Sequence, residues 1–262
     1  MSSSRQRHKA PEPSPDFVQS LARGLSVIEA MGASSGPMTL SQAAAATGLS
    51  RAAARRLLLT LTDLGYVSAS GRNFSLTPRV LGLGYSYLAS LPLAQVVLPP
   101  MERLVEEVHE SSSVSVLDGD EIVYVARVPT KRIVTVNLVV GARLPAYVTS
   151  MGRVLLAALD PCELDAYFAR VAPASHTSRT VTGQPELRRI LAQVARQGWA
   201  LVDQEFTDGV RSMAVPLHDR GGRVVAAMNV SSALTRRAQL QKDVLPRLLA
   251  AASEIDASLR HR

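Results

Sequence analysis

The segment TLSQAAAATGLSRAAARRLLLTLTDLGYV, residues 39–67, decides the fold of the N-terminal part of the chain. Thr39 can cap a short alanine-rich helix, because its hydroxyl can accept a hydrogen bond from a free amide of the first turn. Gly48 can end that helix, since glycine readily adopts the left-handed conformation of a helix C-terminus. Ser50 can cap a second helix over 51–64, whose alanine and leucine residues recur at helical spacing. The segment therefore predicts two helices joined by a tight turn.

The flanking sequence completes this unit. Apolar residues at helical spacing predict a first helix over 17–31, with Asp16 as its N-cap and Gly32 at its end. Two short runs, 66–69 and 73–76, flank a Ser-Gly-Arg turn and predict a β-hairpin. The order helix, helix, turn, helix, hairpin is that of a winged helix-turn-helix, whose second motif helix enters the DNA major groove.

The predicted major-groove helix carries a basic face. Arg51 and Arg55 are four residues apart and share one side, opposite the leucines. Arginine can bind guanine or a phosphate oxygen, and Ala52 and Ala53 leave room for close approach. Arg72, in the hairpin turn, is placed for a phosphate or minor-groove contact. Because a helical bundle with a solvated arginine face would show the same arginines, the spacing of caps and hairpin carries more weight.

The charge distribution also singles out the N-terminal part. The chain has 262 residues and a formal net charge of +7. Residues 1–90 contain 9 Lys and Arg against 4 Asp and Glu, and the remaining residues contain 20 against 18. This asymmetry is typical of a nucleic-acid-binding module attached to a nearly neutral domain, although a solvated basic face is the commoner cause of a few extra arginines.

Composition excludes several classes of protein. No apolar run approaches the ~20 residues that a membrane-spanning helix needs, and the polar, proline-rich residues 1–15 are expected to form a disordered arm, not a secretory signal. A single cysteine, Cys162, excludes an internal disulfide framework and is expected to be buried or inert. The five histidines are scattered, so we expect no metal site and no cofactor. The expected location is the cytoplasm, without membrane contact.

With residues 16–78 assigned to the winged helix-turn-helix, the rest of the chain predicts an α+β domain. Residues 79–92 are expected to form a linker helix ended by Pro92, and residues 93–262 a second domain. Strands are expected on both sides of an Asp-Gly-Asp turn at 118–120. Further helices are expected over 101–109, 150–159, 161–171, 185–197 and 236–259, and further strands over 133–139, 199–206, 213–218 and 223–230. Because many strands pair in hairpins, we expect an antiparallel-rich sheet flanked by helices.

Four motifs carry a resemblance to a known family: LARGL at 21–25, the segment 39–67, TPR at 77–79 and SMGRVLLA at 150–157. With them, the chain resembles the IclR family of bacterial transcription regulators over roughly residues 17–260. It is most similar to the branch of the β-ketoadipate pathway, through LTPRVLGLGYSYLAS, SVLDGDEIVYVARVPT and GARLPAYVTSMGRVLLA.

The resemblance implies a winged helix-turn-helix followed by a GAF-like effector domain, assembled as a homodimer or homotetramer. It also implies double-stranded operator DNA as a partner and control of the catabolism of aromatic acids such as protocatechuate or 4-hydroxybenzoate. The candidate DNA-binding residues are Arg23, Thr39, Ser50, Arg51, Ala52, Ala53, Arg55, Arg56 and Arg72.

The expected effector pocket begins at the helix over 150–159. Ser150 precedes this helix, and the amides of residues 151–153 would point to one spot at the positive end of the helix dipole, which suits an anion. A role of Ser150 as a plain N-cap fits the same geometry. Asn229 and Ser231 alternate on one face of the last strand.

The resemblance adds further effector-binding candidates. It matches Ser150, Met151 and Gly152 to the helix start that contacts effectors, and Ser212 to a small polar position of the pocket. Val202 stands where members that sense small keto acids have an acidic residue, which favours a larger aromatic ligand. The remaining candidates are Tyr147, which could contact a ring, and Arg127 and Arg143, which could meet a second charge.

Two other functions remain open at this point. A small-molecule enzyme acting on aromatic acids, with a basic N-terminal appendage, would need a nucleophile, base or metal set that cannot be assembled from the sequence. An RNA-binding module would need aromatic side chains among its basic residues, and aromatic residues make up only 4% of the chain. The favoured interpretation is a regulator whose effector binds two states of the protein with different affinity.

Overall fold

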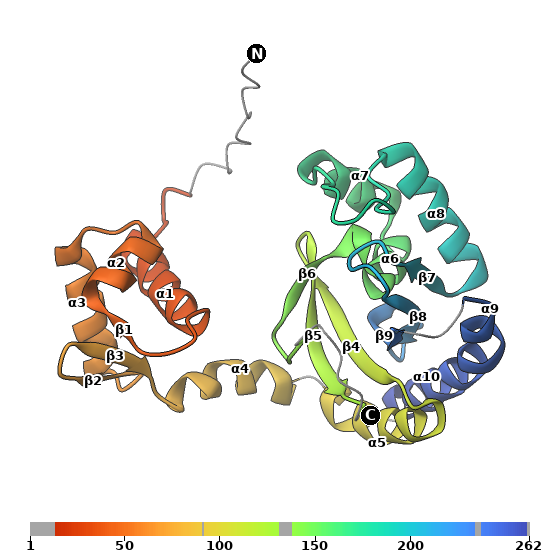
Figure 1. Ribbon diagram of the computed structural model, residues 1–262, viewed down its shortest axis with the longest axis horizontal. Helices are drawn as coiled ribbons and strands as arrows, with labels where there is room; N and C mark the ends of the chain where they lie inside the picture. Colours follow the sequence, from red (N-terminus) through yellow and green to blue (C-terminus); the bar gives the residue numbers. More distant parts are fainter. Residues whose placement is uncertain (1–13, 91, 131–137, 234–236, 261–262) are drawn as a thin grey trace, which may run out of the picture. The chain divides into compact units, whose positions relative to one another are not determined.

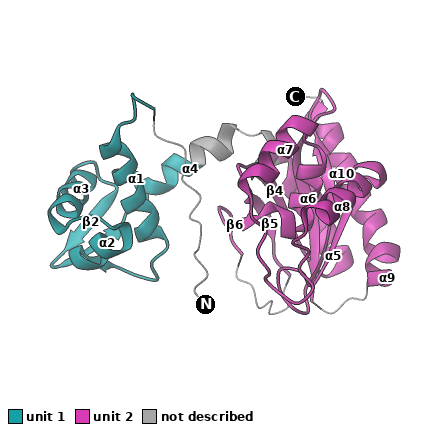
Figure 2. Cartoon of the chain, turned by 90° about the horizontal axis from the view of Figure 1, so that it is seen from above, with its two compact units in different colours: residues 1–87 teal, residues 88–262 magenta. Residues whose placement is uncertain are grey.

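The computed structural model describes residues 14–90, 92–130, 138–233 and 237–260 (Figure 1). The chain divides into two compact units, Met1–Tyr87 and Leu88–Arg262 (Figure 2). Residues 1–13 of the expected disordered arm lie outside the described part. The described elements confirm the predicted α+β class, with a winged helix-turn-helix followed by an antiparallel sheet flanked by helices.

Unit 1 contains the predicted helices and hairpin. Its elements are α1 (Gln19–Gly32), β1 (Met38–Thr39), α2 (Leu40–Thr47), α3 (Arg51–Asp63), β2 (Val67–Ser70), β3 (Asn73–Leu76) and most of α4 (Arg79–Ser90). The helices pack around a small core that includes Val27, Leu58 and Val67. The order β1-β3-β2 makes the wing a three-stranded antiparallel sheet, because β1 adds to the predicted hairpin.

The ends of α2 and α3 follow the capping residues of the sequence. Thr39 and Gln42 form a capping box at the start of α2, and Gly48 ends α2 with a φ of +65°. The Ser50 Oγ accepts a hydrogen bond from the Ala53 N–H at 3.2 Å at the start of α3. The turn between the two helices is therefore set by local hydrogen bonds.

The start of α1 differs from the prediction. Val18, not Asp16, occupies the N-cap position, and no side chain caps the helix. The backbone turns just before it, where the Phe17 N–H donates to the Ser14 carbonyl at 2.9 Å, so Asp16 lies within a turn. The apolar stripe of α1 is also only partly covered within this unit, as Leu21 is 63% exposed.

Unit 2 is a six-stranded antiparallel sheet of order β6-β5-β4-β9-β8-β7, with helices on both faces (Figure 1). On one face, α5 and α10 cover an apolar core that includes Met101, Met228 and Leu248. On the other face, α6, α7 and α8 cover a second core that includes Tyr167 and Leu187. The elements are α5 (Pro92–Val108), β4 (Ser111–Asp118), β5 (Glu121–Val128), β6 (Arg143–Pro145), α6 (Ser150–Ala157), α7 (Pro161–Arg170), α8 (Gln184–Gln197), β7 (Ala200–Asp203), β8 (Arg211–His218), β9 (Val224–Ser232), α9 (Arg237–Gln239) and α10 (Leu245–Arg260).

Two expectations for unit 2 were wrong. The helix expected over 101–109 is the second half of α5, which begins at Pro92 and contains Pro99 and Pro100. The final helix is interrupted by a π-helical turn at Leu240–Val244. Of the two alternatives for Cys162, the structure excludes a buried thiol, because this residue is exposed, and an inert thiol stays a prediction.

The strand expected over 133–139 lies mostly outside the described residues, and residues 138 and 139 form no strand. A short strand that the sequence did not predict, β6, pairs with β5 at the edge of the sheet. Among the helices of the described part, none is long and apolar enough to span a membrane.

Candidate functional site

Unit 2 contains a cavity of about 80 Å³ between the sheet and the start of α6. Polar side chains from three neighbouring strands line it: Ser111 and Ser113 on β4, Asn229 and Ser231 on β9, and Ser212 on β8. The strand register places these residues side by side on one face of the sheet. Three of the predicted effector-binding residues are therefore brought together.

A bulge in the β4–β5 hairpin adds Arg127 to the cavity. Tyr124 pairs with Ser115 and Arg127 pairs with Ser113, so three steps along β5 match two steps along β4. Side chains three residues apart on a regular strand point to opposite faces, and a bulge re-aims them. As a result, both Tyr124 and Arg127 line the cavity.

Arg127 brings a positive charge to the cavity. Its guanidinium donates one hydrogen bond, from Nη1 to the Ser113 Oγ at 3.3 Å. Within the described ranges, no carboxylate lies within ion-pair distance of it. A half-buried cation without a carboxylate partner is suited to bind an anionic group of a ligand.

The start of α6 supplies the opposite wall, in a geometry that corrects the prediction. Thr149, not Ser150, is the N-cap: its Oγ1 accepts a hydrogen bond from the Gly152 N–H at 3.1 Å, and its carbonyl accepts one from the Arg153 N–H at 3.0 Å. Two of the three amides expected to bind an anion are thus occupied. The amides of Ser150 and Met151 remain without a partner among the described residues.

Ser150 belongs to a chain of hydrogen bonds along the cavity. Its Oγ lies 2.7 Å from the Ser212 Oγ, which also accepts a hydrogen bond from the Asn229 Nδ2 at 2.8 Å. The Asn229 Oδ1 in turn accepts one from the Ser113 N–H at 3.0 Å. These bonds fix the orientation of the Asn229 amide and hold the polar side of the cavity rigid.

Three predicted effector-binding residues do not line the cavity. The Tyr147 hydroxyl is held by the backbone of Ala174, donating to its carbonyl at 2.8 Å and accepting from its N–H at 3.0 Å. Arg143 forms ion pairs at the sheet edge with Asp118 and Glu121, both at 2.8 Å, and these bonds raise the pKa of Arg143 above its ordinary value. Gly152 serves packing, because a Cβ there would lie 2.1 Å from the Ala146 carbonyl oxygen.

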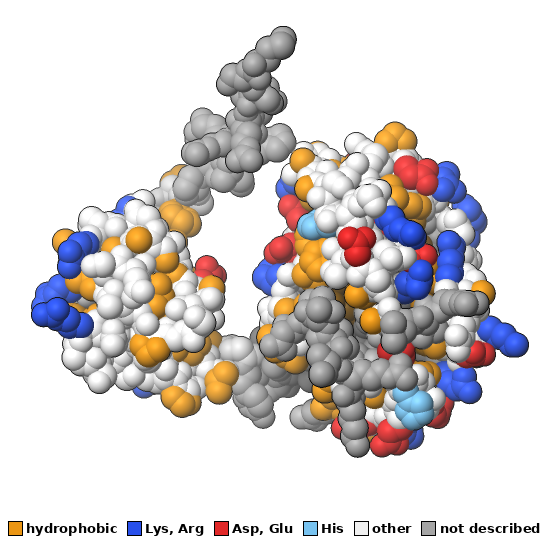
Figure 3. Space-filling model, in the orientation of Figure 1, with side chains coloured by type: hydrophobic (Ala, Val, Ile, Leu, Met, Phe, Trp, Pro, Cys, Tyr) orange, Lys and Arg blue, Asp and Glu red, His pale blue; other side chains and the backbone are white. Residues whose placement is uncertain are grey.

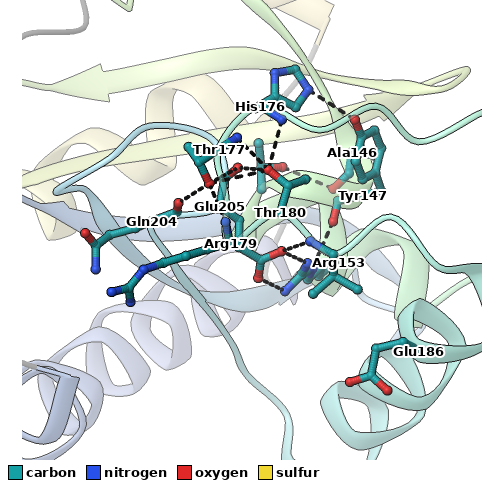
Figure 4. Close-up of polar contacts among 12 residues, drawn as sticks. Ala146, Tyr147, Arg153, His176, Thr177, Arg179, Thr180, Glu186, Gln204 and Glu205 are labelled. Atoms are coloured by element: carbon teal, nitrogen blue, oxygen red, sulfur yellow. Dashed lines mark hydrogen bonds and ion pairs between the residues drawn. The ribbon is translucent and has the colours of Figure 1, made fainter.

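A buried ion pair holds the loop that closes the cavity. Arg153, 2% exposed, donates to both carboxylate oxygens of Glu205 at 2.7 and 2.6 Å and to the Tyr147 carbonyl at 2.9 Å. Figure 4 shows the Glu205 carboxylate turned toward this guanidinium, and the Thr180 hydroxyl donates to the Glu205 carbonyl at 2.6 Å. Because Phe206, the next residue, lines the cavity, the pair ties the cavity wall to α6.

Unit 1 presents a basic surface along α3. Figure 3 shows Lys and Arg side chains gathered on the side of this unit where Figure 1 places α3. Arg51, Ala52, Arg55 and Arg56 are exposed, and none of these arginines has an ion-pair partner among the residues described. Arg72 is exposed in the hairpin turn.

The other predicted DNA-binding residues of unit 1 have different surroundings. Arg23, Ala53 and Arg56 line an apolar groove between α1 and α3. The hydroxyls of Thr39 and Ser50 are used to cap helices. The outward α3 face that is free for DNA is therefore centred on Arg51 and Arg55.

The chain matches two family models: the IclR helix-turn-helix domain over residues 20–71 and the bacterial transcriptional regulator IclR C-terminal domain over residues 85–257. The chain belongs to the IclR family. It is therefore a DNA-binding transcriptional regulator and not an enzyme.

Individual relatives of this IclR-family regulator agree. It is 46% identical over 244 residues to the Pca regulon regulatory protein of Pseudomonas putida, covering 92% of this chain and 84% of that protein. A crystal structure from Rhodococcus sp. RHA1 is 51% identical, with a TM-score of 0.83, over 94% of this chain and 99% of that one. An IclR homologue from Microbacterium hydrocarbonoxydans, crystallised with 4-hydroxybenzoate, is 27% identical, also with a TM-score of 0.83, over 93% and 100% of the two chains.

Several residues that line the cavity of this IclR-family regulator were not among the predicted site residues. Tyr124 alternates with Ile122 on β5, a period-two pattern that could have indicated a shared face. Phe206 and Thr207 follow β7 in a loop, where no periodicity exists to reveal their direction. Val202, singled out in the sequence, does line the cavity. The other lining residues not predicted are Ser111, Ser113, Leu138, Leu144, Val148, Thr149 and Val210.

Proposed function

We propose that this regulator controls genes for the catabolism of aromatic acids and that a small aromatic carboxylate, such as protocatechuate or 4-hydroxybenzoate, is its effector. The observation that carries the proposal is Arg127, a cation without a carboxylate partner among the described residues, in a largely apolar cavity. Apolar side chains suited to a ring, including Met151, Val202 and Phe206, line the same cavity. The similarity to the Pca regulon regulatory protein and to the 4-hydroxybenzoate complex supports the same ligand class.

In this proposal the effector carboxylate pairs with Arg127, not with the amides that open α6. A guanidinium carries a full charge, whereas a helix N-terminus is equivalent to about half a charge, and the Gly152 and Arg153 amides already have partners. The amides of Ser150 and Met151, with Ser212, Asn229 and Ser231, then face other polar groups of the ligand. A mostly apolar cavity with a few oriented polar groups is what ligand specificity requires.

Calorimetry with the purified chain tests the ligand class. We expect 4-hydroxybenzoate or protocatechuate to bind, and the corresponding neutral amide to bind at least about tenfold more weakly, because Arg127 would lose its anionic partner. If acid and amide bound with equal affinity, Arg127 would not pair with the effector carboxylate. If no aromatic acid bound, the proposed class of effector would be wrong.

For the DNA partner, we propose that Arg51 and Arg55 contact base edges of a double-stranded, pseudo-palindromic operator and that Arg72 contacts a phosphate. This follows from the free arginine face of α3 and the position of Arg72 in the wing. Recognition helices read bases with their N-terminal residues, and dimers read two half-sites. Binding to chromosomal DNA would place the regulator in the cytoplasm.

We also propose a homodimer or homotetramer, with the groove of unit 1 as one contact surface. The groove is lined by Leu21, Leu25, Leu64 and Leu83, each about half exposed or more. Exposed apolar patches of this kind mark interaction sites. Light scattering at micromolar concentration should give at least twice the chain mass, and Leu21→Glu should shift the protein toward the monomer.

A further inference from the structure

Tyr124 presents its hydroxyl to the cavity without a partner among the described residues. This side chain is 4% exposed and lines the cavity from β5. Within the described part of the chain, its hydroxyl has no hydrogen-bond partner. A hydroxyl that opens onto the cavity and has no partner among these residues is suited to pair with an occupant of the cavity.

The other polar groups of the cavity differ from Tyr124. Ser150, Ser212 and Asn229 are already joined to one another by hydrogen bonds. Ser231 and Thr207 are partly exposed and can bond to solvent. The Tyr124 hydroxyl can therefore pair with a ligand group without giving up a hydrogen bond to any described residue.

The position of Tyr124 relative to Arg127 indicates where that ligand group stands. Because of the bulge, the two residues are two paired positions apart, opposite Ser115 and Ser113, which corresponds to about 7 Å along the strand. This is the separation of the two backbone positions, and both side chains extend from them to the cavity. Burial raises the pKa of Tyr124 to about 12, although the charge of Arg127 acts against this, so the hydroxyl remains a proton donor at neutral pH.

We propose that Tyr124 determines effector specificity by hydrogen bonding to a hydroxyl on the aromatic ring, at the end opposite the carboxylate that pairs with Arg127. The inference rests on the proposed function and narrows it, since it selects para-hydroxylated benzoates among aromatic carboxylates. In this arrangement Arg127 recognises the acid and Tyr124 recognises the ring substituent. Benzoate would satisfy the first contact only.

The test compares two ligands and two proteins by calorimetry. We expect the unmodified chain to bind 4-hydroxybenzoate about tenfold more tightly than benzoate. Tyr124→Phe, which removes one oxygen atom, should weaken 4-hydroxybenzoate binding about tenfold and change benzoate binding less than about twofold. The preference for the hydroxylated acid should therefore disappear in the variant.

A matched control is Tyr167→Phe, which removes a buried tyrosine hydroxyl from the same core outside the cavity. It should leave the preference between the two acids unchanged, whatever it does to the melting temperature. Equal losses for benzoate and 4-hydroxybenzoate in Tyr124→Phe would overturn the proposal, because Tyr124 would then contact the carboxylate or the ring. Equal affinity of the unmodified chain for both acids would also overturn it while leaving the proposed function intact, whereas binding of neither acid would overturn both.

Discussion

Replacing Arg127 with methionine tests how the cavity recognises an acid. Arg127 is half-buried, lines the cavity and makes one hydrogen bond to the described residues, so the substitution removes a full positive charge with little loss of packing. A hydrogen bond to a charged group contributes about 1.5–3 kcal/mol, and leaving one member of a buried charge pair alone costs about 2–5 kcal/mol. Taking about 3 kcal/mol for a half-buried site, we expect the Kd for 4-hydroxybenzoate to rise about 100-fold.

The assay is calorimetry at neutral pH with 4-hydroxybenzoate and its neutral amide. The amide should bind Arg127→Met about as well as it binds the unmodified chain, because it carries no charge to lose. Arg143→Met is the matched control: this arginine is held by Asp118 and Glu121 away from the cavity, so affinity should change less than about twofold. A loss below about threefold in Arg127→Met, or an equal loss for acid and amide, would refute the pairing of Arg127 with the carboxylate.

Three further predictions concern the DNA surface and the interior. In a binding titration, Arg55→Ala should lose about 1–3 kcal/mol of discrimination between operator and random DNA. Arg72→Ala should weaken binding to operator and random DNA equally and reduce the slope of log affinity against log salt concentration by about one. The reverse pattern would mean that Arg72 contacts bases and Arg55 contacts a phosphate. Arg153→Met should lower the free energy of unfolding by about 3–5 kcal/mol in urea, because it leaves Glu205 as a lone buried charge, and an additional Glu205→Leu should recover part of that loss. Gly152→Ala should unfold the domain or lower its melting temperature strongly, since the added Cβ has no space; a stable variant would contradict the close packing at α6.

The parts of the fold that depend on local hydrogen bonds could be predicted from the sequence. Thr39, Gly48 and Ser50 act on neighbours within a few residues, so capping rules place α2 and α3 without knowledge of the rest of the chain. Capping rules do not fix the first residue of a helix where two adjacent residues can both act as the cap. Thr149 and Ser150 can both cap a helix, and the structure uses the first.

The parts of the site that depend on distant partners could not be predicted. Arg127 is aimed at the cavity by a bulge whose register involves β4, and no residue type in β5 marks it. Tyr147 is held by Ala174, 27 residues away, in a segment without regular structure. Strand alternation predicted that Asn229 and Ser231 share a face, and the family resemblance predicted the position of Ser212; all three line the cavity.

The pairing of strands within the wing also could not be predicted in full from the sequence. The two residues of β1 are too few for any periodic pattern, yet they pair with β3 and extend the hairpin to three strands. Similarly, the partly exposed stripe of α1 has the spacing of a core-facing helix, and the sequence does not show which of its leucines the unit covers.

The measurement that tests the regulator most directly is the affinity for operator DNA with and without effector. A duplex enriched from a random pool by the purified chain would be titrated by fluorescence anisotropy, in the absence and presence of saturating 4-hydroxybenzoate or protocatechuate. We expect one of these acids to change the Kd for this duplex about tenfold, in the unmodified chain but not in Arg127→Met, because an effector shifts a population only through different affinity for two states. An unchanged DNA affinity at full occupancy of the cavity would contradict the proposed regulation.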